Sequence, residues 1–222
     1  MRTPILLTTV ATTALVIATT ASAQDFYGQL YGGITFPDDP TFSGIVGGVP
    51  ADVDTTLDEG FLIGGSVGLR FASVPNLRAE VELSYGENDI DGINFSGNGL
   101  APEVGVGGDI SHTSLLVNGY WDFQTNGPLT PYVGAGLGVG FVDTSAVYGP
   151  GVRLDSSDDV FALQLIAGAS YDLSESTALF ADVRYRQFFD VSADRITPAG
   201  GLASVSDDIS LTSFNVGVRL NF

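Results

Sequence analysis

The chain has 222 residues and a formal net charge of −18, with 26 acidic residues against 8 arginines, no cysteine and a single histidine. So negative a chain has no electrostatic basis for binding nucleic acid. The lack of cysteine and the single histidine exclude disulfide frameworks, thiol nucleophiles and multi-histidine metal sites. Because glycine is abundant, with 29 residues, and mean hydropathy is positive at +0.26, the apolar and acidic residues must occupy different places.

The N-terminal segment 1–23 predicts a cleaved secretory signal. It begins with the basic Arg2, continues with an apolar, threonine-spaced stretch over 5–18, and ends in the small-residue motif A-x-A at 21–23. A retained membrane anchor is the alternative, but the apolar stretch is short. The expected mature domain is 24–222, and no later stretch offers the roughly 18 consecutive apolar residues of a membrane helix.

From residue 24 onward, apolar residues alternate with polar or small ones, which is the signature of β-strands. In 77–85, for example, Val81 and Leu83 alternate with Glu80 and Glu82. Eight segments follow this pattern and are predicted as strands: 26–36, 61–71, 77–85, 112–123, 132–141, 161–172, 179–186 and 212–222.

The connections between these segments alternate in length. Long connections are predicted over 37–59, 87–110, 143–159 and 190–208, and the three between them are short. Outer-membrane barrels have short periplasmic turns and long extracellular loops. The sequence therefore predicts an all-β fold, an eight-stranded antiparallel up-and-down transmembrane β-barrel with both termini in the periplasm and four long extracellular loops.

The positions of the aromatic residues distinguish this barrel from a soluble one. A lipocalin-like barrel, the main alternative, would turn its apolar face inward. On the apolar face of the predicted strands, however, the rings lie near the strand ends and aliphatic residues fill the middles. This arrangement is typical of two interfacial girdles around a lipid-facing band. The rings are Phe26, Phe36, Phe61, Phe71, Tyr85, Trp121, Phe123, Phe141, Phe161, Tyr171 and Phe222.

Three stretches carry a family resemblance: the opening 26–33, the glycine-rich run 131–140 and the ending 214–222. Together they resemble the small, porin-like outer-membrane barrels of Gram-negative bacteria, of the OmpA transmembrane-domain and opacity-protein type. The resemblance implies that an alternating last strand with a terminal aromatic residue is recognised by the barrel-assembly machinery. The residues that match this signal are Phe214, Val216, Val218, Leu220 and Phe222.

Charged residues with lumen-side parity predict an ion-pair network inside the barrel. An eight-stranded barrel is only wide enough for its own side chains, and buried charges must be paired. The four glycines of 134–140 are expected to make room for long neighbouring side chains such as arginines. Two interpretations stay open, a packed salt-bridged lumen and a narrow gated ion path. The predicted network is Arg70, Arg78, Glu80, Glu82, Asp122, Asp182, Arg184, Arg186 and Arg219.

Most of the other acidic residues fall in the four long connections, for example Asp38, Asp39, Asp207 and Asp208. They are expected to keep exposed loops solvated. Clustered carboxylates also suit Ca²⁺ and Mg²⁺, so binding of divalent cations shared with lipopolysaccharide is a further hypothesis. Outer-membrane lipid and lipopolysaccharide are the expected surroundings of the barrel.

His112 and Ser114 have the H-x-S spacing found in a lipid A deacylase family with a similar barrel. Their shared parity places both in the lumen, away from lipid, and no nearby carboxylate is expected to orient the histidine. The sequence thus predicts a monomeric, non-enzymatic protein without cofactor or metal, with a role in envelope structure and surface presentation. The alternatives are a narrow ion channel, an adhesin or other ligand-binding surface protein, and, remotely, a lipid-modifying enzyme.

Overall fold

The computed structural model describes residues 25–39, 41–46, 49–96, 107–148, 152–196 and 202–222, so the predicted signal segment lies outside the described residues. In this part of the chain every regular element is a β-strand, and no helix is long and apolar enough to span a membrane. The strands are β1 (Asp25–Pro37), β2 (Thr41–Val46), β3 (Val49–Leu57), β4 (Gly60–Phe71), β5 (Val74–Ser96), β6 (Gly107–Asp122), β7 (Leu129–Tyr148), β8 (Val152–Asp172), β9 (Thr177–Ile196) and β10 (Leu202–Asn221).

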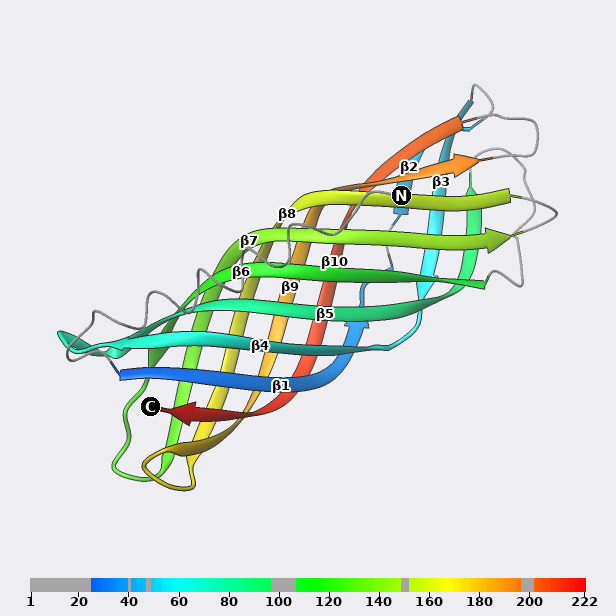
Figure 1. Cartoon of the computed structure of the whole chain (residues 1–222). Coiled ribbons are helices and arrows are strands. Elements are labelled where there is room, and N and C mark those ends of the chain that lie inside the picture. The colour runs from blue at the N-terminus through cyan, green and yellow to red at the C-terminus, as the bar shows by residue number, and fades with distance from the viewer. Residues whose placement is uncertain (1–24, 40, 47–48, 97–106, 149–151, 197–201) are drawn as a thin grey trace, which may run out of the picture.

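Eight of these strands close into a ring. β1 pairs with β4, β4 with β5 and β5 with β6, and from β6 onward each strand pairs with the next along the chain. β10 then returns to β1, with partners running from Tyr27 and Asn221 to Pro37 and Leu211. All these pairings are antiparallel, and the strands run obliquely around the barrel (Figure 1). The predicted eight-stranded, up-and-down barrel is therefore confirmed.

β2 and β3 form a hairpin inside the region 37–59, which was predicted as a loop. β3 pairs with the last part of β5, and β2 pairs with β10 at Gly44 and Ser43. β1 ends at Pro37 and β4 begins at Gly60. Beyond these two residues the hairpin fills the gap that the two strands leave between β10 and β5. The loop prediction for this region is wrong.

The other three long loops were also predicted too long. The strands β5 to β10 extend far into 87–110, 143–159 and 190–208. The residues stay extended there, but the apolar residues now lie on the inner face of the strands and no longer on the outer face. A search for strands with an apolar outer face therefore ends too early, because such a pattern stops where the outer face becomes polar.

The extended strands make a tall barrel. β7, β9 and β10 have 20 residues each, which at ~3.3 Å per residue and a tilt near 40° rise about 50 Å, twice the ~25 Å apolar band of an outer-membrane barrel. The short connections β4–β5, β6–β7 and β8–β9 lie at the end where β1 begins and β10 ends (Figure 1). We call this the turn end, and the opposite end the loop end.

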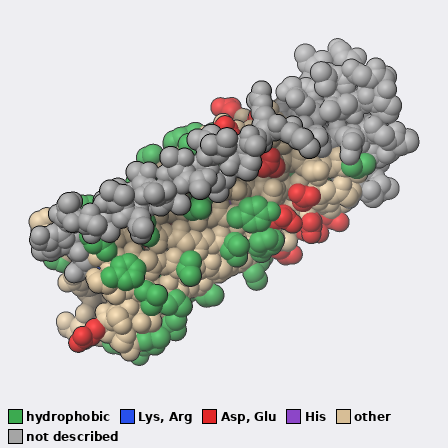
Figure 2. Space-filling view, in the orientation of Figure 1, with side chains coloured by type: hydrophobic (Ala, Val, Ile, Leu, Met, Phe, Trp, Pro, Cys, Tyr) green, Lys and Arg blue, Asp and Glu red, His purple; other side chains and the backbone are tan. Residues whose placement is uncertain are grey.

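β5 shows how the two halves of the barrel differ. Toward the turn end, Glu80 and Glu82 face the lumen and are buried, while Val81 is 48% exposed on the outer face. Toward the loop end the alternation continues without interruption but its chemistry is reversed, because Ile90 is buried and Asp89 is exposed. On the face shown in Figure 2, hydrophobic side chains cover the turn-end half, and most acidic side chains gather toward the loop end.

Aromatic rings mark the edges of the apolar outer belt in the turn-end half. Near the turn end Trp121, Phe123 and Tyr171 point outward and are 44–49% exposed. At the belt's other edge, rings on adjacent strands meet in pairs: Phe36 with Phe214 (centroids 5.8 Å apart), Phe61 with Tyr85 (6.0 Å) and Phe161 with Phe189 (5.7 Å). These two rows correspond to the interfacial girdles that bound a lipid-facing band.

Candidate functional site

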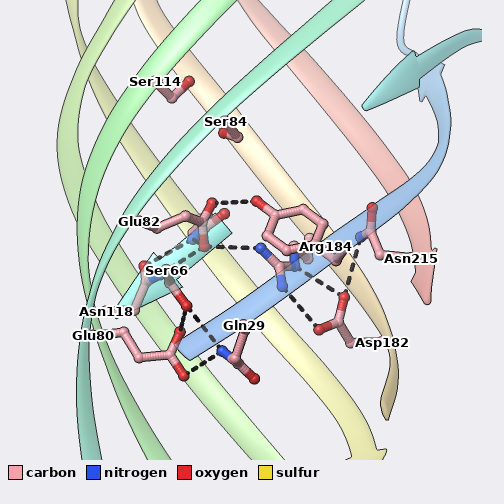
Figure 3. Close-up of polar contacts among 12 residues, drawn as sticks. Gln29, Ser66, Glu80, Glu82, Ser84, Ser114, Asn118, Asp182, Arg184 and Asn215 are labelled. Atoms are coloured by element: carbon pink, nitrogen blue, oxygen red, sulfur yellow. Dashed lines mark hydrogen bonds and ion pairs between the residues drawn. The ribbon is translucent and has the colours of Figure 1, made fainter. Parts of the chain in front are cut away.

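The lumen of the turn-end half is filled by polar side chains, beginning with Arg78 on β5. This guanidinium is fully buried and pairs with two carboxylates, through Nη1 with Glu80 at 2.9 Å and through Nε with Asp122 at 2.8 Å. It also lies 4.5 Å from the centroid of the Tyr120 ring, within cation–π range. Three uncharged side chains donate to Glu80: Tyr27 at 2.7 Å, Gln29 at 2.6 Å and Ser66 at 3.0 Å. Figure 3 shows the bonds from Gln29 and Ser66.

Glu82, one inward position further along β5, is the centre of the network. Its side chain is fully buried, and its two oxygens accept five hydrogen bonds, two of them from arginines. Figure 3 shows the bond from Arg184. These hydrogen bonds offset the cost of removing the carboxylate from water, which would otherwise make its burial unfavourable. The donors are Arg184 Nη1 at 2.8 Å, Arg186 Nη2 at 2.8 Å, Tyr31 Oη at 2.9 Å, Asn118 Nδ2 at 2.8 Å and Gln164 Nε2 at 3.2 Å.

The two arginines reach Glu82 from the far wall of the barrel. Arg184 and Arg186 lie on β9, and three strands separate β9 from β5 in either direction around the ring. The bonds therefore cross the lumen and close it at this level. Arg184 is fixed further by Asp182, at 2.9 Å from Nε, and by the Tyr31 ring, whose centroid is 4.0 Å from its Cζ.

The structure brings together seven of the nine predicted network residues. Five ion pairs join them within the described part of the chain: Arg78 with Glu80 and Asp122, Arg184 with Glu82 and Asp182, and Arg186 with Glu82. Arg70 and Arg219 also face the lumen but take part in none of these pairs. Arg70 donates to the side chain of Asn221, and Arg219 donates to that of Gln29, each at 3.0 Å.

The uncharged half of the network was missed from the sequence. Tyr27, Gln29 and Tyr31 on β1 are all buried, and each binds one of the two central glutamates or its arginine partners. Their alternation along one strand indicates that all three side chains face the lumen. The network was predicted from charged residues alone, so the uncharged hydrogen-bond donors of the same face were not included.

The glycines of β7 leave space that neighbouring lumen side chains fill. A Cβ at Gly134 would lie 2.6 Å from the Tyr120 ring, and one at Gly140 would collide with the Phe188 ring. At Gly136 a Cβ would collide with the Asn118 amide. These glycines therefore make room for neighbouring lumen side chains, but the neighbours found are two rings and an amide, and none of them is one of the arginines that the prediction gave as its example.

Toward the loop end the lumen filling becomes apolar. Phe188 lies there against the His112 ring, with centroids 5.1 Å apart. A cavity of about 10 Å³, enough for about one water molecule, remains beside them. We call the buried cluster the apolar layer; it consists of Leu57, Ile90, Ile110, Leu116, Val142, Ala146, Val160, Ala162, Phe188, Val191, Ile209 and Leu211.

His112 and Ser114 face the lumen, as their parity predicts. Both are buried, and the Ser114 hydroxyl accepts a bond from Arg186 at 3.3 Å. The Nε2 of His112 has no hydrogen-bond partner among the described residues, so it is bonded neither to the Ser114 hydroxyl nor to a carboxylate. The pair does not form the arrangement of a nucleophile with its base.

The described residues contain no group of three or more carboxylate or histidine side chains placed to hold a metal ion. The residues of the expected assembly signal all lie on the outer face of β10 or at its end, with exposed fractions between 39% and 80%: Phe214, Val216, Val218, Leu220 and Phe222. They form part of the apolar belt, which is where a signal read from the lipid side would have to lie.

A closed ring of strands with an apolar belt between two aromatic rows and a charged lumen defines a transmembrane β-barrel of the outer-membrane type. Residues 8–222 match the family described as "Outer membrane protein beta-barrel domain", and the chain belongs to this family. The predicted resemblance to small outer-membrane barrels is thus confirmed, and the family places the protein in the bacterial outer membrane.

Related proteins and structures agree with this assignment. An uncharacterized protein of Brucella suis is 34% identical over 153 residues (60% of this chain, 53% of that protein), and major surface antigen 4 of Anaplasma marginale is 31% identical over 122 residues (51% and 40%). The chain thus spans about half the length, or less, of these relatives. The crystal structure of Neisserial surface protein A shares the fold, with a TM-score of 0.55, 21% identity and coverage of 90% of this chain and 100% of that one.

Proposed function

We propose that the protein is a closed, non-enzymatic barrel that presents a water-facing β extension at the bacterial surface. The observation that supports this most directly is the reversal of the two faces of β5 halfway along its length. In the turn-end half the outer face is apolar, as contact with lipid requires, and the lumen is polar. In the loop-end half the outer face is acidic and the lumen is apolar. A barrel about twice as tall as the lipid band carries its second half beyond the membrane.

Closure of the lumen is supported by two layers of different chemistry. The ion pairs of Glu82 span the lumen in the turn-end half, and the apolar layer fills it toward the loop end. An ion would have to break buried ion pairs and then pass an apolar constriction that excludes water. A structural role is therefore favoured over the narrow ion channel that the sequence left open.

The loop end is proposed to face outward, with both termini in the periplasm. The short connections at the turn end are typical of the periplasmic side of such barrels. The name of the Anaplasma relative, a surface antigen, supports exposure of one end at the cell surface. Lipopolysaccharide would then surround the outer aromatic row, and the barrel-assembly machinery would read the end of β10.

The barrel is proposed to act as a monomer, because each strand of the closed ring already has two neighbours and no free edge remains for a partner. Divalent-cation binding at the acidic loops stays a prediction. Calorimetric titration of the detergent-solubilised protein with Ca²⁺ tests it, and a titration without heat at millimolar concentrations would remove it.

Surface labelling tests the proposed orientation. The chain has no cysteine, so a single introduced thiol reports its own location. Asp91→Cys places it on the exposed outer face of β5 near the loop end, and Asn126→Cys places it in the exposed β6–β7 turn. With a membrane-impermeant maleimide, intact cells should label Asp91→Cys alone, and permeabilised cells should label both.

The reverse pattern, with Asn126→Cys labelled on intact cells and Asp91→Cys protected, would overturn the orientation. Protection of both thiols on intact cells would overturn presentation at the surface. Folding of each variant is checked by the heat-dependent shift in gel mobility that folded outer-membrane barrels show.

A further inference from the structure

Three arginines gather around one tyrosine ring at the turn-end mouth of the lumen. The guanidinium carbons of Arg70, Arg78 and Arg219 lie 5.2, 5.6 and 5.2 Å from the centroid of a single ring, that of Tyr27. Among the described side chains, the buried carboxylates in this part of the lumen are those of Glu80 and Asp122. Both form their ion pairs with Arg78, and neither is paired with Arg70 or Arg219.

Both carboxylates are already occupied by Arg78. Its Nη1 pairs with Glu80 and its Nε with Asp122. Its Nη2 is buried and has no hydrogen-bond partner among the described atoms. A buried guanidinium N–H without an acceptor is costly, and native proteins supply a partner for nearly all such groups. Arg78 therefore has a donor available for a ligand that is not part of the described chain.

Arg219 has still more spare donors. It is 3% exposed, and within the described part of the chain its side chain donates one hydrogen bond, from Nε to the neutral Gln29. A guanidinium has five N–H donors, so both terminal nitrogens of Arg219 are available. Arg219 also lies near the Tyr132 ring, 6.0 Å from its centroid, and Arg78 lies 5.2 Å from the same centroid, so the two cations share a second ring.

We propose that a small inorganic anion such as chloride binds at the turn-end mouth of the lumen, against Arg219 and Arg78 beside Tyr27. The anion accepts hydrogen bonds from the unused guanidinium N–H groups of these two arginines. Arg219 lies two residues before the end of β10, and Arg70 lies one residue before the end of β4. The site is therefore reached from the turn end and does not require passage through the closed network around Glu82.

Anion-dependent thermal unfolding tests the site in the refolded full barrel. Chloride should raise the melting temperature relative to gluconate at equal ionic strength, because a ligand that binds only the folded state stabilises it. A shift of about 2–4 °C is expected for a protein of this size when binding contributes about 1 kcal/mol. Arg219→Gln should abolish the difference between the two anions, and Arg219→Lys should retain part of it.

Arg186→Gln is the matched control. It also removes a buried lumen arginine, but one whose N–H groups already bind Glu82, Gln164 and Ser84. This variant should be less stable and still respond to chloride. If it fails to fold, bromide-soaked crystals of the unmodified protein give the answer, with an anomalous peak expected within hydrogen-bond distance of Arg219. Equal melting in all anions without such a peak, or a chloride effect that survives in Arg219→Gln, would overturn the proposal.

Discussion

The two halves of this barrel have the same backbone and opposite side-chain arrangements. In the turn-end half Glu82 is buried and Leu83 is 52% exposed, whereas in the loop-end half Ile90 is buried and Asp89 exposed. The strand does not break between them, and the alternation continues through the aromatic row. The surrounding medium therefore decides which face is apolar: lipid selects an apolar exterior and a hydrogen-bonded lumen, and water selects the reverse.

The largest effect is expected from removing the centre of the polar lumen. Glu82→Ala leaves two buried guanidiniums without their shared carboxylate, and breaking a buried ion pair in this way costs about 3–5 kcal/mol. Urea unfolding of the refolded protein measures the loss. The control is Asp91→Ala on the exposed face of the same strand, which should change the free energy of unfolding by no more than about 0.5 kcal/mol. Equal effects in both variants would contradict the difference between the halves.

A charge added to the outer face should distinguish the halves almost as strongly. Val117 lies in the belt and is 58% exposed, and Val117→Arg should cost about 2–4 kcal/mol because it places a guanidinium against hydrocarbon. Ser145 is exposed on the outer face beyond the belt, and Ser145→Arg should be nearly neutral. Both are measured as changes in unfolding free energy in lipid vesicles. A comparable cost at Ser145 would mean that the belt extends further than the aromatic row.

Glycine substitutions compare the lumen with the outer face. A Cβ at Gly136 would collide with the Asn118 amide and lie 3.2 Å from Gln164, both of which bind Glu82, so Gly136→Ala should cost about 1–3 kcal/mol. A Cβ at Gly119 meets nothing within 4 Å. Gly119→Ala is thus the control, and it should leave the unfolding midpoint unchanged or slightly raised. Two variants of equal stability would show that the lumen is loosely filled.

The smallest effect concerns the acidic exterior of the loop-end half. Partial burial, together with the carboxylates of Glu87 and Asp89, raises the pKa of Asp109 above its ordinary value of 3.8. Because the folded state binds the proton more tightly, ionised Asp109 disfavours folding at neutral pH, and this penalty disappears as the pH falls through the raised pKa. Asp109→Asn should therefore stabilise the protein by about 0.3 kcal/mol at neutral pH.

The gain from Asp109→Asn should vanish below pH 3.8, where the carboxyl is protonated in both states. Asp143→Asn serves as the control, because its cross-strand partners are Ser111 and Ser157 and it has no carboxylate directly opposite. Urea midpoints at the two pH values measure both. A gain that persists at low pH would show that the effect does not come from charge repulsion.

The turn-end half could be predicted well from the sequence because its apolar face is one continuous outer belt. The positions of Leu83 and Val117 follow from period-two alternation alone. The loop-end half could not be predicted in this way, because the strands were recognised by an apolar outer face. Beyond Tyr85 the residues on the outer face are Glu87 and Asp89. The information was present, since the alternation itself continues there.

The lumen charges could be predicted from parity, but their pairing could not. Glu82 meets Arg184 and Arg186 across the barrel, and such partners depend on the ring's register and not on sequence separation. For the same reason the sequence gives no sign that Arg219 lies beside Tyr27 without a carboxylate.

Single-channel conductance of the refolded barrel domain, residues 24–222, in a planar bilayer tests the closed lumen most directly, with the gel-mobility shift on the same sample to show that the barrel has formed. Folded protein is expected to pass no current, because the Glu82 ion pairs and the apolar layer block the lumen in series. Discrete, reproducible current steps that change in Arg186→Gln would contradict this and show that ions pass through the network.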